Sequence, residues 1–125
     1  MVKFYRGIII VKPHGSLIMN GKKKLIIKSI KLISAINKPL LLIQNKEALG
    51  IIKLKKPKPI NLIQFSKLKN KHKITDKERK KWWKGKRILY SYDVIIVKNY
   101  KKIKKIKYPT GPQVFVKPEN IKFLK

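Results

Sequence analysis

Short blocks of apolar residues rich in Ile, Leu and Val recur along this chain, and they constrain its fold more than any other feature. The clearest blocks cover residues 7–11, 25–27, 40–43 and 94–97. Each has the length of a β-strand, contains β-branched residues and is bounded by polar residues or Pro, which is typical of buried strands. No block approaches the ~20 apolar residues that cross a bilayer, so we expect no membrane insertion.

Strands are predicted over much of the chain, at residues 1–12, 22–33, 40–44, 50–54, 88–97 and 113–116. Turns or loops are expected at 37–39, 46–49, 69–73 and 109–112, and the prolines within 55–59 break regular structure. Several short strands with long-range pairing and few helices predict a mainly β (α+β) fold, a small closed or half-open barrel. A chain of this length forms one domain, 1–125.

Helical signals are few and short. Residues 14–20 form an apolar helical turn that Gly21 stops, and 61–68 is a second helical turn. Thr75 and Glu78 have the spacing of a capping box, which opens a helix that ends near Gly85.

The charge of the chain is extreme, with 34 Lys and Arg against 5 Asp and Glu and a formal net charge of +29. Most of these cations lack an internal partner, so a polyanion relieves their repulsion and releases counterions on binding. Nucleic acid is the first candidate partner, an anionic membrane surface the second and an acidic protein the third. The chain has no Cys and two His, which excludes disulfides and thiolate metal sites, and we expect no metal or cofactor.

The surroundings of the protein are predicted from composition alone. No signal-peptide pattern follows the first apolar block, so a cytoplasmic protein is expected. The bias toward Ile and Lys fits an AT-rich genome. The proteins of thermophiles are enriched in both Lys and Glu. This chain is enriched in Lys but not in Glu, and an archaeal thermophile is the predicted source.

A cluster of lysines lies in the first part of the second predicted strand, residues 22–33. Its lysines can hold phosphate as point charges, and the alternative is a solvated basic hairpin. His14, at the start of this segment, is predicted to be buried or to stabilise a turn. The candidate nucleic-acid ligands here are Lys22, Lys23, Lys24 and Lys28.

A second basic segment contains two adjacent tryptophans. Neighbouring residues of a helix point about 100° apart, so we expect one Trp to cover the barrel and the other to be exposed and stack on a base. The alternative is that both belong to the core. The candidate nucleic-acid-binding residues of this segment are Arg79, Lys81, Trp82, Trp83, Lys84, Lys86 and Arg87.

The remaining polar residues are predicted to have structural roles. His72 is expected to be a solvated loop residue, and Glu78 a helix cap. Glu47 and Asp93 are expected in salt bridges, with a role as general base as the alternative. The residues assigned to barrel packing are Tyr90, Tyr92, Tyr100 and Tyr108.

The order of these segments resembles the ASCH domains of the PUA-like superfamily. The family pattern Gly-x-Lys-x-x-Glu-x-Arg is matched by Gly21 and Lys23, while Lys28 replaces Arg and Ile26 departs from it. Residues 40–43, 48–52, 90–94 and 107–113 are similar to later segments of the family, in the family's order. The resemblance implies a PUA-like barrel with a basic cleft beside the short helix. The strand pattern alone fits an OB-fold or an SH3-like barrel equally well.

The resemblance also implies an association with RNA. Members of the family are implicated in RNA binding, and some are ribonucleases or amidohydrolases of acetylated cytidine that use a Lys, a Thr and a Glu. Lys23 matches the Lys, but Ile26 stands at the Thr position and has no nucleophile. We therefore predict a non-catalytic RNA-binding module, free or within a ribonucleoprotein. An RNA-directed hydrolase and a DNA-binding architectural protein are the alternatives.

Overall fold

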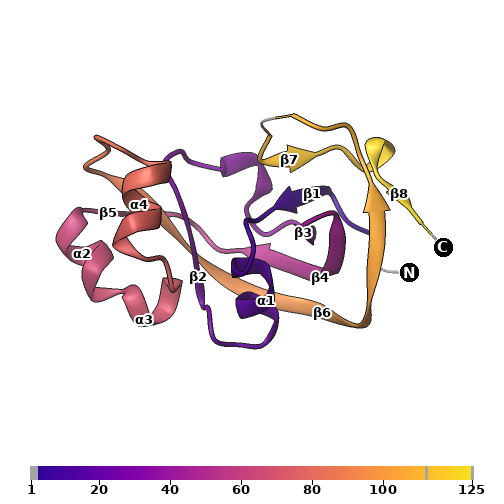
Figure 1. Cartoon of the computed structure of the whole chain (residues 1–125), viewed down its shortest axis with the longest axis horizontal. Coiled ribbons are helices and arrows are strands. Elements are labelled where there is room, and N and C mark those ends of the chain that lie inside the picture. Colours follow the sequence, from indigo (N-terminus) through magenta and orange to yellow (C-terminus); the bar gives the residue numbers. More distant parts are fainter. Residues whose placement is uncertain (1–2, 112, 125) are drawn as a thin grey trace.

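The chain folds around one curled sheet that forms a half-open barrel with a few short helices (Figure 1). The computed structural model describes residues 3–111 and 113–124. Its strands are β1 Arg6–Ile9, β2 Leu25–Lys28, β3 Leu40–Gln44, β4 Glu47–Leu54, β5 Lys58–Ile60, β6 Leu89–Lys107, β7 Phe115–Val116 and β8 Lys122–Phe123. Its α-helices are α1 His14–Met19, α2 Leu62–Lys67, α3 Lys69–His72 and α4 Asp76–Trp82, and 3₁₀ turns cover Ile33–Ala35 and Pro118–Asn120.

Strand β6 organises the sheet. The strand order is β2-β6-β4-β3-β1-β7, and β5 and β8 also pair with β6. Strands β1 and β3 are parallel, whereas the other pairings of these strands are antiparallel. The predicted mainly β, half-open barrel with short helices is therefore confirmed.

The core lies on both faces of the sheet. All five residues of β3 are buried, which explains why residues 40–43 are apolar without alternation. One apolar cluster fills the inside of the barrel around Leu42 and Tyr92. A separate cluster around Phe65 and Leu89 lies at the helical end of the molecule.

The helices form two groups near one end of β2. Helices α2, α3 and α4 gather at the end of the sheet where β2 and β5 pair with β6, and α1 packs against β3 and β4 (Figure 1). This packing favours Gly15, because a Cβ there would lie 3.0 Å from Gln44 Cβ and 3.1 Å from Leu49 Cδ1. After α1 the chain reverses through Gly21, whose φ of +81° favours glycine.

Several sequence predictions are confirmed. The strand at 40–44 and the helical turn at 14–20 are present. Helix α4 begins at the predicted capping box, in which Thr75 and Glu78 exchange hydrogen bonds. Helix α2 has a capping box of its own, formed by Asn61 and Gln64.

Other boundaries were wrong, mainly where long-range pairing overrides local composition. The strand predicted at 88–97 continues through the lysine-rich segment to Lys107, because β4 and β8 pair with that part. Strand β4 begins at Glu47 where a loop was predicted. Strand β5 falls in the predicted proline break, since an edge strand tolerates Pro59. Residues 69–72 form α3 instead of a loop, and the strand predicted at 22–33 shrinks to β2.

The ends of the chain complete the comparison. Of the strand predicted at 1–12, β1 is present, and Met1 and Val2 lie outside the described residues. Pro112 of the predicted turn also lies outside them. Within the described residues, none of the helices has the length and hydropathy needed to cross a membrane.

Candidate functional site

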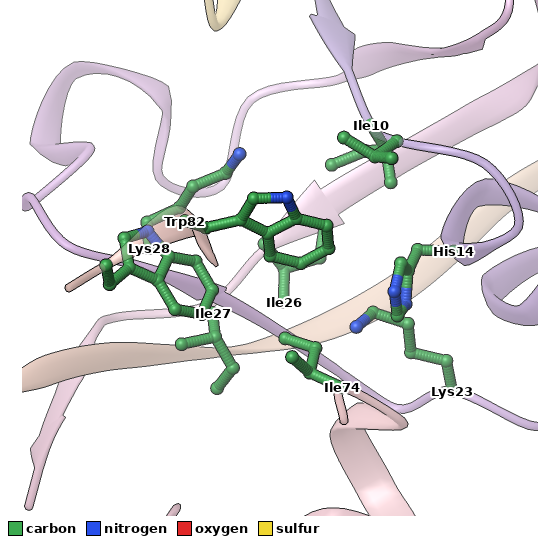
Figure 2. A pocket seen from close by; sticks show the side chains of 10 residues that line it. Ile10, His14, Lys23, Ile26, Ile27, Lys28, Ile74 and Trp82 are labelled. Atoms are coloured by element: carbon green, nitrogen blue, oxygen red, sulfur yellow. The ribbon is translucent and has the colours of Figure 1, made fainter. Parts of the chain in front are cut away.

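A pocket of about 170 Å³ lies between α1, β2 and α4 (Figure 2). Figure 2 shows His14 and Lys23 close together on one side of this pocket and Lys28 on the opposite side. Aliphatic side chains of β2 and its surroundings form much of the wall, and α4 contributes its aromatic end. The lining residues are Ile10, Val11, His14, Lys23, Ile26, Ile27, Lys28, Ile74, Trp82 and Trp83.

Backbone hydrogen bonds hold the segment before β2 against two helices. The Lys23 N–H donates to the Leu17 carbonyl of α1 over 2.9 Å, and the Lys24 N–H donates to the Lys71 carbonyl of α3 over 2.7 Å. Lys23 is therefore enclosed by two helices that lie far apart in the sequence.

Lys23 is buried, with a side chain that is 4% exposed. Its ammonium group donates a hydrogen bond to the His72 carbonyl. Burial lowers the pKa of Lys23 to about 7, against the attraction of Glu78 and with added repulsion from Lys28. The alternative of a solvated basic hairpin is wrong for Lys23, because the chain turns inward before β2 begins. Near neutral pH this amine can gain or lose a proton.

His14 and Glu78 form a second polar group of the pocket. His14 Nε2 lies 2.9 Å from Glu78 Oε2. Burial lowers the pKa of His14 despite this hydrogen bond, so the neutral imidazole donates Nε2–H to the carboxylate. Its Nδ1 is buried and has no hydrogen-bond partner among residues 3–111 and 113–124. Nδ1 is thus an unused acceptor on a residue that lines the pocket.

Glu78 has a double role that keeps it charged. Burial by itself raises the pKa of Glu78, but hydrogen bonds from Thr75 and His14 outweigh that effect and lower it. The predicted role of Glu78 as a helix cap is confirmed, and the same side chain also orients His14.

Both tryptophans line the pocket, and both are half-buried. The Trp82 ring meets His14 edge-on, with centroids 5.6 Å apart, and meets Trp83 at 5.5 Å. The prediction of one covering and one exposed Trp is wrong, and so is the alternative of two core residues. Helix α4 ends at Trp82, and Trp83 has non-helical φ and ψ of −133° and 44°. The 100° spacing of helix residues therefore does not separate the two rings.

The other predicted ligands are distributed around the pocket. Lys28 is half-buried and lines it, and burial lowers the pKa of Lys28. Arg79 is half-buried and lies over the Phe65 ring at 6.0 Å. The remaining candidates are exposed outside the pocket: Lys22, Lys24, Lys81, Lys84, Lys86 and Arg87.

The structural role of His72 was not predicted from the sequence. It is fully buried, where a solvated loop residue was predicted. Its Nε2 donates to the Phe65 carbonyl over 2.7 Å, its Nδ1 accepts the Ile74 N–H over 2.9 Å, and its ring stacks on Phe65 at 4.1 Å. These bonds fix the His72 carbonyl that holds Lys23. The lysine-rich neighbours of His72 concealed this role.

Two smaller predictions are confirmed. Tyr92 is buried in the barrel, and its hydroxyl donates to the Ile30 carbonyl over 2.9 Å. Asp93 forms a surface salt bridge with Lys58 at 3.7 Å. In the described part of the chain, no three His, Asp or Glu side chains gather in a way that could hold a metal ion.

The structure of the chain is similar to solved structures, whereas comparisons of its sequence find no match. No family model matches the sequence, and no curated protein matches it. The structure is similar to the crystal structure of ASCH from Zymomonas mobilis, with a TM-score of 0.62 and 11% identity over 96% of this chain and 87% of that one. A mutant of the same protein matches with the same score and identity over 98% and 91% of the two chains. The class of fold is therefore that of the ASCH proteins, a small PUA-like β-barrel.

Proposed function

We propose that this protein is a non-catalytic RNA-binding module that takes one unpaired base into the pocket between α1, β2 and α4. The observation that carries the proposal is the composition of that pocket. It combines two half-buried indoles, two lysines and a buried imidazole with an unused acceptor. Exposed lysines around the pocket hold the phosphate backbone.

The size of the pocket suits one aromatic ring system. Its volume of about 170 Å³ equals the share of roughly five or six water molecules. Sites for drug-sized ligands have at least about 300 Å³. One base therefore enters the pocket, and the rest of the strand stays on the surface.

Each chemical group of the pocket matches a feature of a nucleotide. Stacking of a base on an indole contributes about 1–3 kcal/mol and tolerates any base. Lys23 and Lys28 line the pocket, and their ammonium groups donate to the carbonyl groups of the base or to phosphate. The net charge of +29 supplies the long-range attraction to the strand.

The choice of RNA over DNA rests on the resemblance to ASCH domains and on the general use of unstacked bases in RNA recognition. The test measures anisotropy of a fluorescein-labelled single-stranded RNA, with DNA of the same sequence as the comparison. If about six phosphates are contacted, log affinity falls against log salt with a slope of roughly −4. Tryptophan emission is quenched in the same titration. A slope near zero without quenching would reject the proposal.

One observation favours an RNA-directed hydrolase as the second candidate. Glu78 orients a neutral His14, and Lys23, with a pKa of about 7, lies in the same pocket. Ile26 lines the pocket without a nucleophilic atom, so hydrolysis would use a water activated by His14 Nδ1. Turnover of acetylated cytidine or RNA by the protein, lost in His14→Phe, would favour this candidate. Binding without turnover supports the module.

A further inference from the structure

A second hollow of about 420 Å³ opens beside Tyr90 of β6. It is larger than the first pocket, and its lining is mostly apolar and includes two lysines. Among the described residues that form it, none is acidic. The lining residues are Lys31, Ile33, Ile36, Lys56, Pro57, Pro59 and Tyr90, and we call this hollow the Tyr90 groove.

The Tyr90 groove adjoins the first pocket across a single pair of residues. Lys28 of β2 lies directly opposite Tyr90 of β6 in the antiparallel register. Such partners share one face of the sheet, with Cβ atoms about 4.5–5.5 Å apart. Lys28 lines the first pocket and Tyr90 lines the groove. A chain that leaves the pocket past Lys28 therefore meets Tyr90 next.

We propose that the Tyr90 groove binds the nucleotide that neighbours the one held in the first pocket. Its base stacks on the half-buried Tyr90 ring, and its phosphate lies near Lys31 or Lys56. This inference rests on the proposed function and adds a second subsite to it. The protein thus recognises at least a dinucleotide step of single-stranded RNA.

The cations of the groove argue for a nucleotide. Lys31 Nζ lies over the Tyr90 ring, 5.6 Å from its centroid, so a cation already contacts this aromatic surface. Both Lys31 and Lys56 are exposed, and neither forms an ion pair within the described part of the chain. A nucleotide is aromatic and negatively charged, so its base can stack on the Tyr90 ring while its phosphate pairs with a lysine. An apolar protein segment would leave these charges without a partner.

The apolar floor favours a planar ligand. Ile33 is 66% exposed, and Pro57 and Pro59 carry no side-chain polar atoms. A base covers this surface with its flat face and needs no hydrogen bond from it, as in sites that bind single strands without sequence preference. We therefore expect little base selectivity from this subsite.

The experiment compares a mononucleotide with a short strand. Adenosine monophosphate and a fluorescein-labelled oligoadenylate are titrated against the full chain and against Tyr90→Leu. Because Tyr90 lies outside the first pocket, affinity for the mononucleotide stays unchanged. Affinity for the oligomer falls by about tenfold to a hundredfold, and Tyr90→Phe restores most of it. In Lys31→Gln with Lys56→Gln the salt slope flattens by roughly 0.7 for each lost phosphate contact.

A matched control is Tyr100→Leu, which changes a half-buried tyrosine of the same strand outside both hollows. This variant should keep oligomer affinity. If Tyr90→Leu binds the oligomer as tightly as the unchanged protein, the groove serves another ligand, such as a protein segment, and the inference fails. Equal losses for mononucleotide and oligomer would also overturn it, since they indicate general disruption. Absence of oligomer binding by the unchanged protein would instead reject the proposed function.

Discussion

Two lysine-rich regions look alike in the sequence and differ completely in the structure. Residues 22–28 approach and enter β2, and residues 98–107 form the distal half of β6. The first region encloses Lys23 between α1 and α3, whereas Lys101 and Lys102 of the second are exposed on a strand. The number of cations in a sequence predicts attraction to a polyanion. Burial in the folded structure decides which of those cations belongs to a binding pocket.

The buried lysine carries an energetic cost that the exposed lysines do not. Removing an ammonium group from water is unfavourable unless a partner compensates. The His72 carbonyl and Glu78 compensate in part, and the pKa of Lys23 still falls to about 7. Of the distal lysines, Lys101 and Lys102 are exposed to water, whereas Lys104 is half-buried, with its Nζ 4.8 Å from the centroid of the Tyr100 ring.

The largest expected effect is a difference between the two regions in how they make the free energy of unfolding depend on pH. Unfolded Lys23 holds its proton up to about pH 10.5, but the folded protein loses it near pH 7. Between these values the unfolded state binds more protons, so the free energy of unfolding rises with pH, by on the order of 4 kcal/mol. Urea denaturation over this pH range measures the rise. Lys23→Met should flatten it and Lys102→Met should retain it, and equal curves for both variants would contradict the assignment.

The next effect concerns the aromatic wall of the pocket. Trp82→Ala removes a stacking surface and should weaken single-strand binding by about 1–3 kcal/mol. Because Trp82 also packs against the Phe65 cluster, the free energy of unfolding should fall by about 1–3 kcal/mol. Anisotropy and urea denaturation measure the two losses. Trp82→Phe keeps a ring and should recover part of both. A variant that loses stability but no affinity would remove Trp82 from the binding surface.

A smaller effect tests the pairing of His14 with Glu78. Glu78→Gln preserves the capping box but removes the charge that raises the pKa of His14. The pKa of His14 should therefore fall further, and stability should drop by about 1–2 kcal/mol. A titration of the His14 ring protons by NMR measures the first change. The surface acid Glu119 provides the control in Glu119→Gln, and an unmoved His14 pKa in Glu78→Gln would show that the pair is not coupled.

The smallest effect belongs to the distal lysines. Lys101→Gln with Lys102→Gln should change the free energy of unfolding by no more than about 0.5 kcal/mol, since both side chains are exposed. RNA affinity at low salt should weaken, while the amplitude of tryptophan quenching stays the same. Titrations at two salt concentrations measure both. Reduced quenching at saturation would mean that these lysines position the base and are more than a source of charge.

Local signals predicted the elements whose causes lie within a few residues. The uninterrupted apolar run at 40–43 predicted a strand, and β3 is that strand. The capping box of Thr75 and Glu78 predicted where α4 begins, because both partners lie within one helical turn. The order of such segments also led to the ASCH-type barrel, and the net charge of +29 led to the proposed polyanion partner, which stays a prediction.

The pocket depended on contacts that no local pattern records. His14 and Glu78 are 64 residues apart, and Lys23 and the His72 carbonyl are 49 apart. A lysine in a basic run has the same local signature whether water or a helix covers it. The sequence by itself determined β3, the start of α4 and the charge, since propensity, capping and composition act over short distances. Only the tertiary structure decided which cation is buried and which imidazole nitrogen is left unpaired, because burial is set by distant elements that pack together.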